Sequence, residues 1–124
     1  MKEKLVRLSE VREIEGFEPP HHTLTVDRKL VDKEDGAKNF AIWHGEVGVG
    51  GVAEVHSHRM EQAFLILSGK ALFEIEGRRY ELSQGDLIFL PSWLPHGIKS
   101  IGEKPLEILI FMAPPPESLE EWKR

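Results

Sequence analysis

Seven short apolar segments between residues 39 and 113 constrain the fold of this 124-residue chain more than any other feature. Five of the segments end directly at glycine, proline or serine, and all seven end before they are long enough for an ordinary α-helix. The segments cover residues 40–47, 52–58, 63–67, 72–76, 80–82, 87–90 and 106–112. Short segments with such turn residues between them predict an all-β sandwich or small barrel.

The local patterns within these segments agree with strands. In residues 72–76 the apolar side chains Phe73 and Ile75 alternate with glutamates, and Gly77 supplies a hairpin turn. The continuous apolar run 63–67 suits a strand that is buried on both faces. Pro91 ends the strand before it, because proline cannot donate to a ladder of hydrogen bonds.

The two ends of the chain differ from this central part. Residues 1–38 are polar and interrupted by glycine and proline, so we expect an N-terminal arm with at most short strands, followed by a barrel over residues 39–114. Residues 115–124 form a tail. In the tail, Ser118 and Glu121 have the spacing of a capping box, which predicts a short helix that contains Trp122.

Composition removes several classes of function. The net charge of −5, without a clustered basic face, argues against nucleic-acid binding. No apolar run approaches the roughly 20 residues of a membrane span, and the N-terminus has no apolar stretch of a secretory signal, so we expect a cytoplasmic protein. Few amides beside many Lys and Glu residues are typical of a thermophilic source, although ordinary variation explains them equally well.

Two histidines stand out in this cysteine-free chain, where any metal must take histidine, carboxylate or amide ligands. Because strand side chains alternate, His56 and His58 project from one face. Gln62 shares their parity and Glu61 does not, which favours Gln62 as a further ligand unless the chain is irregular in between. A pair alone supplies half of a coordination shell and is as often solvent-facing. His96, on a later strand, can complete the set in a barrel.

The spacing of these residues resembles the two motifs of the cupin superfamily. In the first motif a glycine, the His-x-His pair, a glutamate and a second glycine recur at fixed intervals. This chain matches every interval, with glutamine in place of the glutamate, at Gly50, His56, His58, Gln62 and Gly69.

The second cupin motif is matched with two changes. Gly85, Pro91 and His96 fall at the expected intervals, while Trp93 stands where the family has glycine and Ser100 where it has asparagine. Only 15 residues separate the two motifs, which is at the short end for the family.

The resemblance implies a double-stranded β-helix, or jelly-roll, that binds one divalent ion (Fe, Mn, Ni, Co, Cu or Zn) through His56, His58, Gln62 and His96. It also implies a small-molecule enzyme of the dioxygenase, decarboxylase or sugar and keto-acid isomerase type, commonly a homodimer. The alternatives are a non-catalytic binding or sensing module and a metal-free structural cupin.

Other side chains keep two interpretations. Aromatic residues can line a pocket beside the ion or belong to the core; Trp93, close to His96, is the strongest pocket candidate among Trp43, Trp93 and Phe111. Met60 can close the site or pack, and His44 can shuttle protons or be a satisfied polar group. The remaining polar candidates are expected at the surface: His21, His22, Glu54, Arg59 and Glu61.

Overall fold

The computed structural model describes residues 2–124, in which nine strands surround a common interior. The elements are η1 (Leu8–Glu13), β1 (Gly16–Phe17), β2 (His22–Val31), η2 (Lys33–Asp35), β3 (Ala41–His56), β4 (Glu61–Ser68), β5 (Lys70–Ile75), β6 (Arg78–Ser83), β7 (Leu87–Leu90), β8 (His96–Ser100), β9 (Leu106–Ala113) and η3 (Leu119–Glu121). No helix in this part of the chain has the length and apolarity that a membrane crossing needs.

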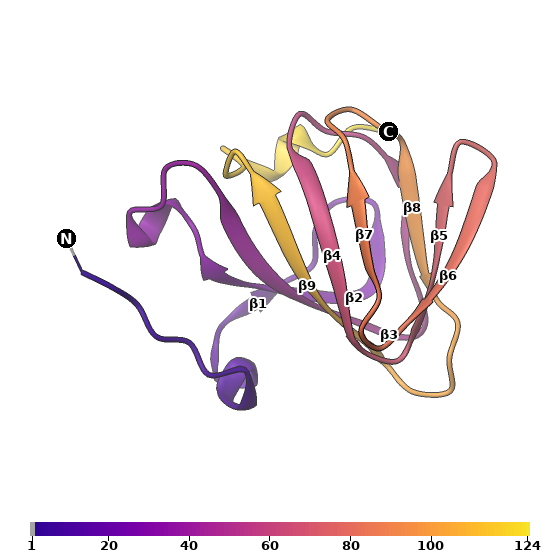
Figure 1. Cartoon of the computed structure of the whole chain (residues 1–124), viewed down its shortest axis with the longest axis horizontal. Coiled ribbons are helices and arrows are strands. Elements are labelled where there is room, and N and C mark those ends of the chain that lie inside the picture. The colour runs from indigo at the N-terminus through magenta and orange to yellow at the C-terminus, as the bar shows by residue number, and fades with distance from the viewer. Residues whose placement is uncertain (1) are drawn as a thin grey trace.

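The strands form one antiparallel sheet, rolled into a nearly closed barrel (Figure 1). Its order is β6-β5-β8-β3-β9-β4-β7. Strand β3 is long enough to pair with β9 through its first half and with β8 near its end. The predicted all-β jelly-roll is therefore confirmed.

The segment 1–38, which we expected as an arm, contributes sheet strands. Strand β2 pairs antiparallel with β3, and β1 pairs with β2. Ion pairs hold this segment to the barrel: Arg28 lies 2.6 Å from Glu46, and Arg12 lies 2.7 Å from Glu107. Strand β2 thus reaches one side of the barrel interior.

Apolar side chains that alternate along the strands fill most of the interior. Along β9 buried positions alternate with half-buried ones, as expected for a strand with one face on the core. Phe64 and Phe73, from β4 and β5, pack edge to face with ring centroids 5.2 Å apart. Burial of each such side chain contributes about 1.5–3 kcal/mol, so this cluster fixes the strands that carry the polar residues.

The C-terminal tail contains no α-helix, which corrects the sequence prediction. Residues Leu119–Glu121 form a single 3-10 turn. The Ser118 hydroxyl accepts from the backbone N–H of Glu120, but the Glu121 carboxylate accepts from Glu117 and leaves the capping box incomplete. After this turn the tail pairs with the barrel rim, where Ser57 and Lys123 exchange two backbone hydrogen bonds of 2.7 and 2.9 Å.

Candidate metal centre and adjoining cavity

Three histidines meet inside one end of the barrel. His56 ends β3, His96 begins β8, and the two are paired across the sheet; His58 follows two residues after His56. One nitrogen from each ring can be chosen so that all three lie within 4.8 Å of one another. All three side chains are buried, with exposed fractions of 3% or less.

Backbone carbonyls fix the tautomer of each ring. The Nδ1 atoms of His56, His58 and His96 lie 2.7, 3.0 and 2.9 Å from carbonyl oxygens two residues away in the chain. A carbonyl oxygen only accepts, so each Nδ1 carries the proton and each neutral ring keeps its lone pair on Nε2. This is the orientation that metal-binding histidines take from their outer hydrogen bonds.

Burial also keeps these rings neutral. It lowers the pKa of His56 to about 3, with His96 as a further cause, and the pKa of His96 to about 4. Burial lowers the pKa of His58 as well. The rings are therefore in the deprotonated form that a metal ion requires at neutral pH.

Gln62 faces the histidines from β4. It is buried and lines the same cavity, whereas Glu61 is exposed on the opposite face of the strand. Three side-chain atoms of this group are buried without a hydrogen-bond partner among residues 2–124: Nε2 of His58, Nε2 of His96 and Oε1 of Gln62. Each unpaired buried group costs about 1–3 kcal/mol. Two imidazole nitrogens and an amide oxygen that line the same cavity are a ligand set that suits a divalent cation.

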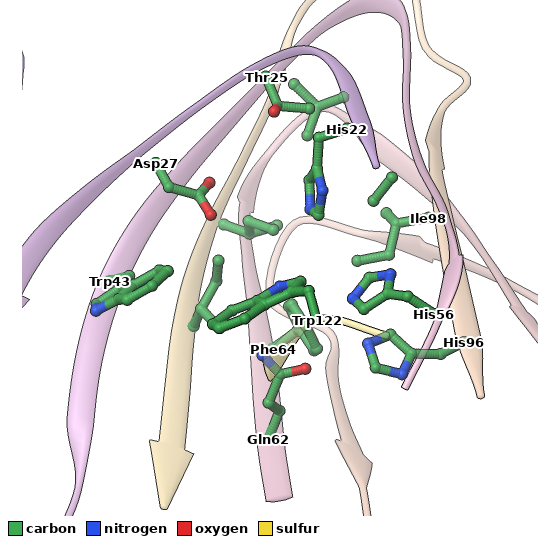
Figure 2. A pocket seen from close by; sticks show the side chains of 14 residues that line it. His22, Thr25, Asp27, Trp43, His56, Gln62, Phe64, His96, Ile98 and Trp122 are labelled. Carbon is green, nitrogen blue, oxygen red and sulfur yellow. The ribbon is translucent and has the colours of Figure 1, made fainter. Parts of the chain in front are cut away.

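A cavity of about 30 Å³ adjoins the histidines. Figure 2 shows His56 and His96 on one side, Gln62 below them, and Asp27 of β2 across the cavity. His22, which is also on β2, lies next to His56, with ring centroids 5.4 Å apart. Trp122 lies between the two sides. A space of this size holds one or two water molecules, so any larger occupant requires Trp122 to move.

Aromatic residues form part of the cavity wall, and of the three candidates only Trp43 is among them. Trp43 lines the cavity, and Trp122 stacks on it with ring centroids 5.7 Å apart and planes 7° apart. Trp122 also lies 5.5 Å from the ring of His58. The preferred candidate, Trp93, does not line the cavity and is 55% exposed, and Phe111 lies on the outer surface beside Phe89.

The tail that carries Trp122 is attached to the strand segment that carries the histidines. Arg59 lies 2.9 Å from Glu121, and Glu54 lies 2.6 Å from Arg124. Arg59 and Glu54 were expected to be solvated. In the structure, together with the Ser57–Lys123 backbone pairing, they hold the tail across the cavity.

Strand β2 supplies residues that the sequence did not reveal: His22, Thr25 and Asp27 line the cavity. The expectation that His22 is a surface residue is wrong. A register shift at Leu24, whose φ is 59°, lets both His22 and Thr25 face inward despite their odd spacing. The sequence does not reveal which residues of β2 face inward, because this strand has polar residues on both faces.

Two other candidates lie away from the cavity lining. His44 is buried, but it follows Trp43 on β3 and so points to the opposite face of the strand; burial lowers its pKa. Met60 is fully buried, and its carbonyl accepts from His58. Its role is to orient that ring and to pack.

Residues 43–112 match the family model of the cupin domain, and the chain belongs to this family. The match spans β3 to β9 and includes all the histidines of the metal centre. It excludes β2 and the C-terminal tail, so the family pattern covers one side of the cavity only.

Three proteins illustrate what the chain is similar to. An uncharacterized protein of Methanocaldococcus jannaschii is 37% identical over 70 residues, covering 56% of each chain. Auxin-binding protein 1 of Arabidopsis thaliana is 25% identical over 99 residues, covering 70% of this chain and 50% of its own. The chain thus spans about half the length of these relatives. The polyketide cyclase RemF of Streptomyces resistomycificus is 26% identical, with a TM-score of 0.78 over 93% of this chain and 83% of its own.

Proposed function

We propose that this cupin is a metal-dependent enzyme that acts on a small molecule and holds one divalent ion through His56, His58, Gln62 and His96. The observation that carries the proposal is the group of unpaired buried atoms, Nε2 of His58, Nε2 of His96 and Oε1 of Gln62. Without an ion, the fold would bear the cost of three buried polar atoms with nothing to bind.

The ligand set favours Lewis-acid chemistry over the other reactions that cupins carry out. All four ligands are neutral, because a glutamine amide replaces the carboxylate of the family pattern. When bound, an ion with such ligands keeps its full charge and polarises a carbonyl or hydroxyl oxygen strongly. We therefore favour carbonyl chemistry of the isomerase or cyclase type, and place decarboxylation and dioxygenation second.

Other residues of the chain orient the ligands and shape the cavity beside them. The carbonyls of Glu54, Met60 and Leu94 hold the three rings in one orientation. The stacked Trp43 and Trp122 line the same space, which is large enough for only one or two water molecules. The similarity to a polyketide cyclase at 26% identity supports an enzyme over a binding module.

The test is elemental analysis of untagged protein, followed by a turnover screen. We expect one divalent ion per chain. The reconstituted Fe, Mn, Ni and Zn forms are then assayed with keto acids, sugar acids and diketones. Protein that neither retains nor takes up an ion would contradict the proposal.

A non-catalytic binding module is the second candidate. The enclosed cavity and the similarity to auxin-binding protein 1 favour it. A module of this kind would bind a small ligand to saturation in calorimetry and leave it chemically unchanged, whereas an enzyme would convert it.

We also propose that the protein is a homodimer. Leu87 and Phe89 lie on β7, at one end of the strand order, and are 63% and 58% exposed. An edge strand with exposed apolar side chains is open to pairing with another chain, and a second copy of the protein would bury it. Light scattering should give twice the chain mass of 14.2 kDa, and Phe89→Asp should halve it. A monomer at every concentration would contradict the dimer.

A further inference from the structure

The side of the cavity opposite the histidines has two polar side chains without partners. Thr25 is 3% exposed, and its Oγ1 is buried with no hydrogen-bond partner among the described residues. Asp27 is 7% exposed, and its carboxylate takes part in no hydrogen bond or ion pair recorded for residues 2–124. Figure 2 shows both reaching into the cavity from β2.

The strand opposite Asp27 leaves room for its carboxylate. Asp27 is paired with Gly45 of β3. A Cβ atom at position 45 would lie 3.0 Å from Oδ1 of Asp27 and within 3.2 Å of Ile108 and Ile110. Any residue other than glycine would crowd the carboxylate, so the local geometry accommodates an acid at this place.

Among residues 2–124, no positive charge compensates the Asp27 carboxylate. The neighbouring Arg28 bonds to Glu46 and to the carbonyl of Ile14 instead. His22, His56 and His96 share the cavity, and burial lowers the pKa of each. Burial raises the pKa of Asp27 to about 7. A buried acid without a partner costs stability, and such groups in cavities are candidates for function.

We propose that Asp27 is the catalytic residue that transfers a proton, and that Thr25 binds an oxygen of the same substrate. The substrate is a small carbonyl compound with an acidic C–H bond next to the carbonyl. This inference rests on the proposed function, because it needs the carbonyl oxygen to lie against the histidine side of the cavity. It also needs Trp122 to move aside, because the cavity of about 30 Å³ holds no more than one or two water molecules.

The step balances without a further reactant. The Asp27 carboxylate takes the proton from the carbon next to the carbonyl, so the C–H bond breaks and an O–H bond forms on Asp27. The electron pair of that C–H bond becomes the carbon–carbon double bond of an enolate, whose charge lies on the former carbonyl oxygen. Return of the proton to carbon restores the carboxylate.

His22 is the alternative base, since it also lines the cavity. Its Nδ1 donates to the carbonyl of Pro20 at 2.8 Å, which leaves Nε2 free. Burial lowers its pKa, which makes it a weaker base, whereas burial makes the Asp27 carboxylate a stronger one. A variant of His22 therefore belongs in the test.

The experiment follows exchange of C–H for C–D in pyruvate and in dihydroxyacetone, dissolved in D2O with the zinc-loaded full chain, by proton NMR. Removal of a general base costs typically 10²–10⁴-fold, so Asp27→Asn should slow exchange at least about 100-fold while zinc content stays the same. Glu61→Gln, on the exposed face of β4, should exchange like wild type. Thr25→Val should raise the half-saturating probe concentration more than it lowers the maximal rate.

A second measurement does not depend on turnover. In the metal-free full chain with ¹³C-labelled aspartate, one carboxyl resonance should titrate near neutral pH and vanish in Asp27→Asn. Thermal unfolding of the same variant confirms that it folds. A residue with only a structural role would affect neither the pH profile nor exchange at constant metal content.

The outcomes separate the two proposals. If the chain binds no zinc, the proposed function fails. If zinc binds, the Asp27 assignment is overturned by any of three results: exchange in Asp27→Asn within twofold of wild type, loss of exchange in His22→Gln but not in Asp27→Asn, or no exchange of either probe by wild type above free zinc. An Asp27 resonance that titrates with the exposed aspartates also overturns it.

Discussion

The two sides of the cavity come from different parts of the chain and have different chemistry. The histidine side comes from β3, β4 and β8, inside residues 43–112 that match the cupin domain. The other side comes from β2 and from Trp122 in the tail, both outside that match. One side has buried lone pairs suited to an ion, and the other has the Thr25 hydroxyl and the Asp27 carboxylate. We therefore propose that the shared fold provides the metal centre and that the flanking segments select the substrate.

Loss of the histidine side should have the largest effect. His56→Ala combined with His96→Ala removes two ligands. Loss of an outer hydrogen-bond partner already costs 10–100-fold in metal affinity, so we expect the double variant to lose at least about 100-fold. Competition with a chromophoric chelator measures this; unchanged affinity would place the metal site elsewhere.

Trp122→Ala should affect the other side and leave the ion bound. It removes a side chain that is 5% exposed and stacked on Trp43. Truncation of a buried Trp costs about 3–5 kcal/mol, and we expect the lower end because the residue lies in a tail. Urea unfolding gives this value, and chelator competition gives the affinity. A loss of metal affinity equal to that of the double histidine variant would remove the distinction between the sides.

Arg59→Gln should destabilise the attachment of the tail less than Trp122→Ala does. It breaks the ion pair with Glu121 but keeps Trp122. Because the Arg59 side chain is 38% exposed, water and salt screen the pair, and we expect only a small loss of stability. Loss of more stability than in Trp122→Ala would mean that the ion pair, not the tryptophan, holds the tail.

The two sides of the cavity also differ in how far the sequence predicted them. The three histidines and the inward direction of Gln62 were predicted, because motif spacing and strand alternation are local properties. Thr25 and Asp27 were not, because β2 is polar on both faces and a register shift at Leu24 alters its parity. Trp122 was placed in a helix, because its position depends on pairing between residues 57 and 123, far apart in sequence.

The pH dependence of the free energy of unfolding should reveal the raised pKa of Asp27. Its pKa rises from 3.8 in the unfolded chain to about 7 in the fold. Between these values the folded state holds a proton that the unfolded state has released, so the contribution of Asp27 to stability falls as pH rises and is lowest above pH 7. Asp27→Asn should therefore be the more stable protein at pH 8, by up to about 4 kcal/mol, since each of roughly three pKa units counts for about 1.4 kcal/mol.

The histidines act in the opposite direction in the same pH range. Their folded pKa values lie below 6.5, so metal-free protein loses stability as pH falls from 6.5 toward 4. Both proteins share this loss, and the difference between wild type and Asp27→Asn isolates the carboxylate. Urea unfolding of metal-free protein from pH 5 to 8.5 measures it. A difference that does not grow between pH 5 and 7 would show that Asp27 has an ordinary pKa.

Replacement of the neutral fourth ligand, Gln62, by a charged glutamate should have the smallest effect on metal affinity. Gln62→Glu restores the carboxylate of the family pattern, so we expect metal affinity to stay the same or rise, since metal affinity depends on the charge of the ligands. Glu61→Gln, on the exposed face, should change affinity little. The opposite ranking in a chelator titration would make Glu61 the ligand.

The location of the ion tests the account most directly. A crystal structure of zinc-reconstituted protein, with anomalous data at the zinc edge, reveals the ion independently of the side chains. We predict one peak per chain, about 2.0–2.2 Å from Nε2 of His56, His58 and His96 and from Oε1 of Gln62, with a further coordination position open toward Asp27. A peak bound elsewhere, or an ion closed to the cavity, would contradict the account.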